Sequence, residues 1–165
     1  MTKVAVHALS FAVVAVAGTS TAMAQTGRAT SVTVNATKLN FGTKLNPFSL
    51  PADTTATLTL KYKNNVGTCV GSSVVTLSPG LGVGATAGNR KMTSGGNTLS
   101  YTIYTPPGPP TTVWDNVIGY TTPSISITKG STTTQTVTMY GRILGNQSNA
   151  AVGSYTDTVT ITVLF

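Results

Sequence analysis

Histidine, cysteine and glutamate supply most catalytic and metal-binding side chains, and this chain of 165 residues has almost none of them. His7 and Cys69 are alone of their types, glutamate does not occur, and the acidic residues are Asp53, Asp115 and Asp157. The parts of a Ser-His-Asp triad or a Cys/His zinc site are therefore missing. A glycosidase needs two carboxyl groups placed together, whereas we expect Asp53 in a turn, Asp115 in a loop and Asp157 in the last strand. We predict no enzyme, no catalytic residue, no metal and no cofactor.

Long hydrophobic runs are also lacking, and the longest one lies near the start of the chain. Lys3 is followed by an apolar stretch over residues 8–17 and by the small-x-small pattern Ala22-Met23-Ala24, which are the three parts of a secretory signal. Ten apolar residues are too few to span a bilayer, which takes roughly 20. We therefore predict a signal peptide over residues 1–24, a mature domain over residues 25–165 and an exported product without a membrane span.

Acidic residues are so few that the formal net charge is +7. A positive balance can indicate nucleic-acid binding. Here only Lys61/Lys63 and Arg90/Lys91 are close in sequence, and no aromatic residues are interleaved with them. We therefore expect the basic side chains on a solvated surface and no nucleic-acid partner.

Threonine, by contrast, occurs 33 times and alternates with apolar residues. This alternation is typical of half-buried strands, and threonine suits their solvent face because it is β-branched and polar. Strands are expected over residues 57–62, 98–103, 124–128, 136–139 and 155–165. Turn signals rich in glycine and proline separate them, and no stretch has the helical period. The pattern predicts an all-β sandwich of about seven strands.

The strand expected over residues 155–165 is the strongest in the chain and runs to its last residue. No later strand follows it in the sequence. We therefore expect its open edge to pair with an earlier strand, to stay open or to receive a strand from another molecule.

Several strings resemble the spore coat protein U domain family, which is also the fold unit of archaic chaperone–usher pilins. In chain order they are LNFGT (39–43), NP (46–47), RKM (90–92), SGGNTLSYTIY (94–104), TVW (112–114), YGRI (140–143) and GSYTDTVTITV (153–163). Their order and spacing match the family from about residue 32 to the end of the chain.

The resemblance implies an incomplete immunoglobulin-like sandwich whose final strand is supplied in trans by β-augmentation. In such pilins a periplasmic chaperone fills the groove, and the N-terminal extension of a neighbouring subunit replaces it at the outer-membrane usher. The implied function is an exported structural subunit of a surface fibre. Its implied partners are the chaperone, the usher and neighbouring subunits of the same or a related kind, and its implied path leads through the periplasm to the cell surface.

The resemblance also suggests site residues. We expect the polymerisation groove to be lined by Tyr155, Val159, Ile161, Val163 and Phe165. Val32 and Val34 are the nearest candidates for a donor strand or for the first strand of the domain itself.

Two features depart from the family. Its members usually carry two cysteines that form a disulfide, but by spacing from Phe41 the corresponding positions here fall near Val32 and Tyr62, and neither is a cysteine. Cys69 therefore has no partner in the chain, and it either is buried and unreactive or pairs with a thiol of another molecule. Residues 25–31 (QTGRATS) are polar where a donor strand is usual. Either the donor is very short, or Val32 and Val34 serve twice, or the subunit accepts a strand without giving one.

Two other functions stay open at this point. The domain could be a self-contained extracellular coat or matrix protein, which its short N-terminal region favours. A carbohydrate-binding tip module would use Trp114, the sole tryptophan, although we expect a core or rim position for it. Asp157 lies in the family's Gly-x-Tyr-x-Asp-Thr pattern, and we expect it to bind the main chain or a hydroxyl near the start of the last strand.

Overall fold

The computed structural model describes residues 3–5, 10–14, 29–45, 50–117, 119–147 and 150–165. Every secondary-structure element assigned in these residues is a β-strand, which confirms the predicted all-β fold. They form a five-stranded sheet, a four-stranded sheet and two pairs of short strands, arranged as an immunoglobulin-like sandwich. In this described part of the chain, no helix has the length and apolarity needed to cross a membrane.

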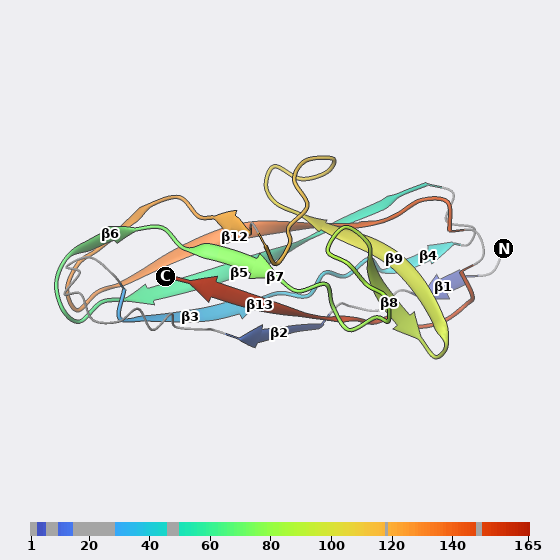
Figure 1. Cartoon of the computed structure of the whole chain (residues 1–165), viewed down its shortest axis with the longest axis horizontal. Coiled ribbons are helices and arrows are strands. Elements are labelled where there is room, and N and C mark those ends of the chain that lie inside the picture. Colours follow the sequence, from blue (N-terminus) through green and yellow to red (C-terminus); the bar gives the residue numbers. More distant parts are fainter. Residues whose placement is uncertain (1–2, 6–9, 15–28, 46–49, 118, 148–149) are drawn as a thin grey trace.

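The larger sheet is antiparallel and has the strand order β3-β5-β12-β9-β8. Its strands are β3 (Ser31–Ala36), β5 (Ala52–Lys63), β12 (Thr132–Ile143), β9 (Asn97–Tyr104) and β8 (Arg90–Ser94). β5 and β12 pair over 12 residues each, from Ala52 opposite Ile143 to Lys63 opposite Thr132. This ribbon runs along most of the molecule (Figure 1) and carries the other strands of the sheet on its two sides.

The smaller sheet has the order β10-β7-β13-β2. Its strands are β10 (Tyr120–Thr121), β7 (Val74–Leu77), β13 (Thr158–Leu164) and β2 (Ser10–Val14). The two short pairs join β1 (Lys3–Ala5) to β4 (Thr43–Leu45) and β6 (Cys69–Gly71) to β11 (Ile125–Ile127). The last strand, β13, therefore lies inside its sheet, between β7 and β2.

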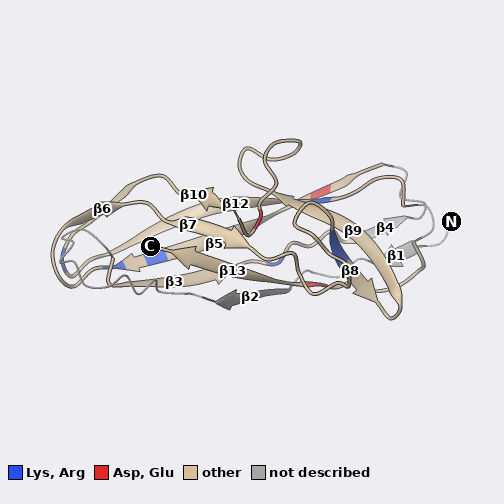
Figure 2. Ribbon diagram, viewed as in Figure 1, with Lys and Arg blue, Asp and Glu red and all other residues tan. Residues whose placement is uncertain are grey.

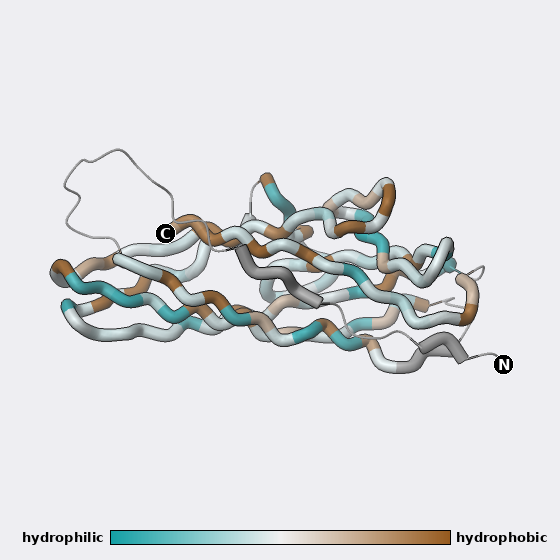
Figure 3. Tube along the Cα trace, turned by 90° about the horizontal axis from the view of Figure 1, so that it is seen from below, coloured by the Kyte–Doolittle hydropathy of each residue, from teal (hydrophilic) through white to brown (hydrophobic). Residues whose placement is uncertain are grey.

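One face of each main sheet is apolar, and the two apolar faces form a single core. The larger sheet contributes residues such as Leu58, Leu60 and Met139, and the smaller sheet contributes Leu77 and Ile161, all without exposed surface. Figure 3 shows hydrophobic and hydrophilic segments alternating along the strands, as the two-residue period requires. The threonine-rich faces point to solvent, as the sequence predicted.

The last strand starts later than expected, at Thr158 rather than Tyr155. The reason is that Thr156 pairs with the other sheet. Its main-chain N–H donates to Thr93 O of β8 at 3.0 Å, and its carbonyl accepts from Thr93 N at 2.8 Å. The chain therefore crosses between the sheets just before β13 begins.

Two shorter strands, β7 and β8, were not predicted. β7 reads VVTL, with two adjacent valines and a single polar residue. β8 reads RKMTS and starts with a charged residue that faces the core. Both break the alternation on which the sequence prediction depended. Asp53 was also misplaced, because it lies in β5 instead of a turn, and its carboxylate accepts hydrogen bonds from Arg142 Nε and Nη2 at 2.6 and 2.7 Å.

Candidate functional site

The inner face of β13 is continuous with the core. Val159, Ile161 and Val163 have no exposed surface, while Thr160 and Thr162 between them are half-buried on the other face. One edge of β13 pairs with β7 in antiparallel register, with Ile161 opposite Leu77. This edge is therefore closed by the domain itself.

The other edge of β13 pairs with β2 in parallel register, from Thr158 opposite Ser10 to Thr162 opposite Val14. Figure 1 shows β2 alongside β13 at the margin of the molecule. β2 comes from the apolar run of the predicted signal peptide. Of the three outcomes expected for this edge, the structure therefore shows the first, in which the edge pairs with an earlier strand. If residues 1–24 are removed, as predicted, the β13 edge loses this partner.

A buried carboxylate fixes the start of β13. Asp157 Oδ1 accepts hydrogen bonds from the main-chain N–H groups of Thr158 at 2.7 Å and Leu81 at 2.8 Å, and Oδ2 accepts from Tyr101 Oη at 2.7 Å. The expectation that Asp157 binds main chain and a hydroxyl is confirmed. Burial, together with the adjacent Asp157 charge, raises the pKa of Tyr101 well above its usual value, so the phenol remains a hydrogen-bond donor.

The loop after β7 also holds β13. Ser78 N donates to Thr160 O at 2.9 Å, and Thr160 N donates to Ser78 Oγ at 2.9 Å. Gly80 has a φ of +92° and lies against the Asp157 carboxylate, where a Cβ atom would overlap it. Only glycine adopts this backbone conformation easily and also leaves room for the carboxylate.

A buried arginine ties the same loop to the core. Arg90 has no exposed surface, and its guanidinium donates to the carbonyls of Ser78 at 3.0 Å, Ala87 at 2.6 Å, Leu77 at 3.3 Å and Trp114 at 2.6 Å. Desolvation lowers the pKa of Arg90. The prediction that the basic residues lie on a solvated surface is wrong for this one, because four main-chain carbonyls replace water around it.

Comparison with family models decides the family. The Spore Coat Protein U domain model matches residues 10–162, nearly the whole chain. The chain belongs to the Spore Coat Protein U domain family. Members of this family are typically subunits of fimbriae or pili, and the family is not one of enzymes. Comparison with curated proteins gives no match.

The two positions near which the resemblance to the Spore Coat Protein U family places cysteines lie side by side in the structure. Val32 of β3 and Tyr62 of β5 are register partners, as are Val34 and Leu60. Val32 and Val34 lie in β3, paired with β5, and are half-buried against the core. Cys69, the only cysteine, is a buried free thiol at the start of β6, with 3% of its surface exposed.

Trp114 is part of the core of this Spore Coat Protein U domain. It has no exposed surface, its Nε1 donates to Val75 O at 2.7 Å, and its ring centroid lies 5.3 Å from that of Tyr120. A carbohydrate platform needs an exposed ring face. The hypothesis of a binding module centred on Trp114 therefore loses its site.

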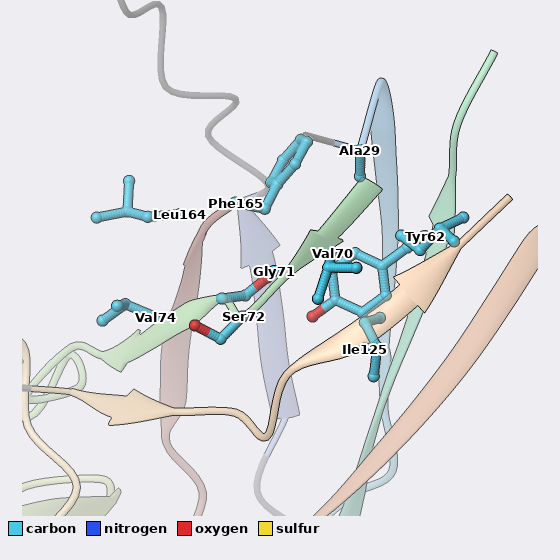
Figure 4. A pocket seen from close by; sticks show the side chains of 11 residues that line it. Ala29, Tyr62, Val70, Gly71, Ser72, Val74, Ile125, Leu164 and Phe165 are labelled. Atoms are coloured by element: carbon cyan, nitrogen blue, oxygen red, sulfur yellow. The ribbon is translucent and has the colours of Figure 1, made fainter. Parts of the chain in front are cut away.

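The two remaining groove residues lie beyond the ends of β13. Tyr155 is fully buried, and its Oη donates to Ala151 O at 2.8 Å. Phe165 is half-buried and lines a pocket of about 480 Å³ at the end of the sandwich, together with Leu164, Tyr62 and Val70. Figure 4 shows this pocket beside the end of the last strand. The pocket was not predicted, because its lining comes from loops and strand ends without a shared sequence pattern.

Each of the three carboxylates has structural partners. Asp53 pairs with Arg142, Asp157 is described above, and Asp115 Oδ1 accepts from Val117 N at 2.9 Å and Gly119 N at 3.3 Å. Figure 2 shows the three acidic residues on separate parts of the ribbon. Within the described ranges, no three His, Cys, Asp or Glu side chains gather in a way that could hold a metal ion.

Proposed function

We propose that the chain is an exported structural subunit of a surface fibre. Its open strand edge is filled first by a periplasmic chaperone and then, at the outer-membrane usher, by a strand that a neighbouring subunit supplies in trans. Membership of the Spore Coat Protein U family supports the fibre. The mechanism rests on the edge of β13, which in the described structure is covered by residues 10–14, inside the predicted leader. No enzymatic role is part of this proposal.

The main chain of β13 provides the physical basis for strand complementation. Removing β2 leaves a row of unpaired N–H and C=O groups beside a strand whose inner residues belong to the core. Such an edge readily pairs with another chain. An added strand satisfies these groups through main-chain hydrogen bonds and covers the adjacent core. Folding of the mature subunit would thus be completed by a partner.

The test is production of the full chain with export, so that the predicted leader is removed, with and without a small immunoglobulin-like chaperone. We expect the processed protein alone to aggregate or to unfold at low denaturant concentration, and to be recovered as a complex when the chaperone is present. Size-exclusion chromatography with urea unfolding measures both. A processed protein that unfolds cooperatively as a stable, partner-free monomer would contradict the proposal.

A second function has support of its own. Asp157 fixes the start of β13 through Tyr101 and main-chain N–H groups, and Arg90 holds the adjacent loop after β7, without help from any other molecule. A self-contained extracellular coat or matrix subunit would depend on such internal contacts alone. The stable monomer that contradicts strand complementation is the result expected for this second function.

A further inference from the structure

We propose that the mature subunit accepts a strand but has none to give, so that the occupant of its β13 edge comes from a different polypeptide. This inference rests on the proposed function, since it concerns the same edge. It adds the kind of partner: an extended segment with apolar residues at every second position, on a protein other than a second copy of this chain.

The structure indicates what this edge accepts. Over the five positions of β2, Phe11 lies opposite Val159 and Val13 lies opposite Ile161. Val159 and Ile161 are fully buried, while Thr160 between them is half-buried on the outer face. A strand beside β13 therefore meets core residues at alternate register positions only, and apolar residues are needed at those positions.

The N-terminal region of the mature chain does not offer such a segment. Residues 25–31 read QTGRATS, in which Ala29 is the only apolar side chain. Ala29 is also packed against the core of its own subunit and lines the end pocket. A strand formed by these residues would bring polar groups to the register positions that border the core, which is costly without hydrogen-bond partners.

The nearest alternating segment, β3, is already used. All six of its residues pair with β5, from Ser31 opposite Lys63 to Ala36 opposite Leu58. Further hydrogen bonds hold both ends: Thr30 N and Oγ1 donate to Lys63 O at 2.8 and 3.0 Å, and Thr37 N donates to Thr57 O at 2.9 Å.

Giving β3 to a neighbour would therefore open a second edge in the donor. β5 would keep β12 on one edge but would lose β3 along six positions on the other, next to its core residues Leu60 and Tyr62, now 0% and 2% exposed. The donor would lose as many strand pairings as the neighbour gained. Exchange of β3 between identical copies has no net driving force from strand pairing.

A position in the fibre follows from this asymmetry. In a fibre where the N-terminal region of each subunit fills the groove of the subunit before it, a subunit without a donor segment has no groove that it can fill. Such a subunit can lie only at the end of the fibre where no subunit comes before it. Copies of this chain alone would not form a fibre. A different protein that carries a donor segment must follow it.

The test uses the full chain, exported so that the leader is removed, and co-exported with a soluble carrier protein. One carrier displays ALSFAVVAVA, the sequence of residues 8–17, a second displays QTGRATSVTVNA, the sequence of residues 25–36, and a third displays nothing. We expect a soluble one-to-one complex with the first carrier only, measured by pull-down and native mass spectrometry. We also expect no linear homopolymers with the second or third carrier, by analytical ultracentrifugation.

Matched variants of the first carrier test the alternation. Phe11→Asp with Val13→Asp in the displayed segment should abolish the complex, whereas Ser10→Asp with Ala12→Asp should leave most of it. A chain with a second copy of ALSFAVVAVA inserted between Ala24 and Gln25 should stay soluble without any carrier, because the added segment can cover the β13 edge of its own chain, as β2 does, or that of a neighbour.

The possible failures are distinguishable. If the first carrier does not bind, the open edge and with it the proposed function are wrong. If the first carrier binds and the unmodified chain also forms linear homopolymers, or binds the second carrier, the edge is real and only the inference of an acceptor without a donor is overturned.

Discussion

Asp157 joins three parts of the molecule at one carboxylate. Its oxygens accept hydrogen bonds from the loop at Leu81, from Tyr101 of β9 and from the first N–H of β13. The sequence allowed this contact to be expected, because Asp157 lies in the family's Gly-x-Tyr-x-Asp-Thr pattern near the start of the last strand. The burial of Arg90 could not be predicted in the same way, because a charged residue between Asn89 and Lys91 is typical of a surface position. Only the folded structure brings together the four carbonyls that surround its guanidinium.

Replacing Asp157 with asparagine should destabilise the fold. The amide keeps one acceptor oxygen but puts an NH2 group where Oδ1 or Oδ2 now accepts, so that at least one buried donor loses its partner. We expect the free energy of unfolding of the full chain to fall by about 1–3 kcal/mol in urea titrations.

Asp53→Asn is the matched control for this change. Its ion pair with Arg142 is half-exposed, with 52% of the aspartate side chain accessible, and such pairs contribute at most about 1 kcal/mol. Equal losses of stability in the two variants would contradict the role assigned to Asp157.

Tyr101 makes the fold sensitive to high pH. In the folded chain burial and the Asp157 charge raise its pKa, while in the unfolded chain it ionises near its ordinary value of 10.0. Above pH 10 the unfolded state therefore releases a proton that the folded state keeps, and stability declines as pH rises, by up to about 1.4 kcal/mol per pH unit for this group.

Tyr101→Phe should flatten this decline, although the variant starts from a lower stability because Asp157 loses a donor. Urea unfolding between pH 8.5 and 11 measures the slope, with Tyr104→Phe, a half-buried neighbour in β9, as the control. An unchanged slope in Tyr101→Phe would show that the phenol ionises equally in both states.

At the scale of elements, the register of β3 against β5 explains how the domain relates to its family. Val32 and Tyr62, near which the family resemblance places two cysteines, are register partners across the two strands. We expect Val32→Cys with Tyr62→Cys to form a disulfide in air, seen as a loss of 2 Da and of two titratable thiols. Thr33→Cys with Tyr62→Cys should not, because Thr33 points to the opposite face.

The sequence predicted those elements whose alternation is regular and missed those in which it is interrupted. β5, β9, β12 and β13 have threonine at nearly every second position and were found. β7 has only one polar residue, Thr76, and begins with two adjacent valines, and β8 places Arg90 where an apolar residue is usual. The start of β13 was misjudged because Tyr155 continues the pattern in sequence while Thr156 pairs with the other sheet.

At the scale of the whole molecule, the pairing of β2 with β13 joins segments almost 150 positions apart, from Ser10–Val14 to Thr158–Leu164. Sequence patterns predict that each segment can form a strand, but they do not show which strands lie next to each other in a sheet. The apolar run near the start was therefore interpreted as a leader alone. The structure adds that this run fits the edge of the last strand.

The full chain kept in the cytoplasm, where the predicted leader would stay attached, should therefore be more stable than a variant in which residues 10–14 are replaced by GSGSG. We expect the variant to unfold at lower urea concentration and to aggregate more. The same replacement at residues 19–23 of the leader is the control and should behave as the unmodified chain. Identical midpoints for all three proteins would show that β2 contributes nothing to the fold.

The way in which Arg90 is held has a consequence for evolution. Its acceptors are carbonyls of the main chain, and every amino acid provides one. Substitution at Ser78, Leu77, Ala87 or Trp114 therefore leaves the acceptor in place, whereas no other side chain has the donors to reach all four. Among homologous proteins we expect an arginine at this position, whichever residues supply the four carbonyls. Methods that search for pairs of positions changing together would pass over this contact, although Arg90 has no exposed surface.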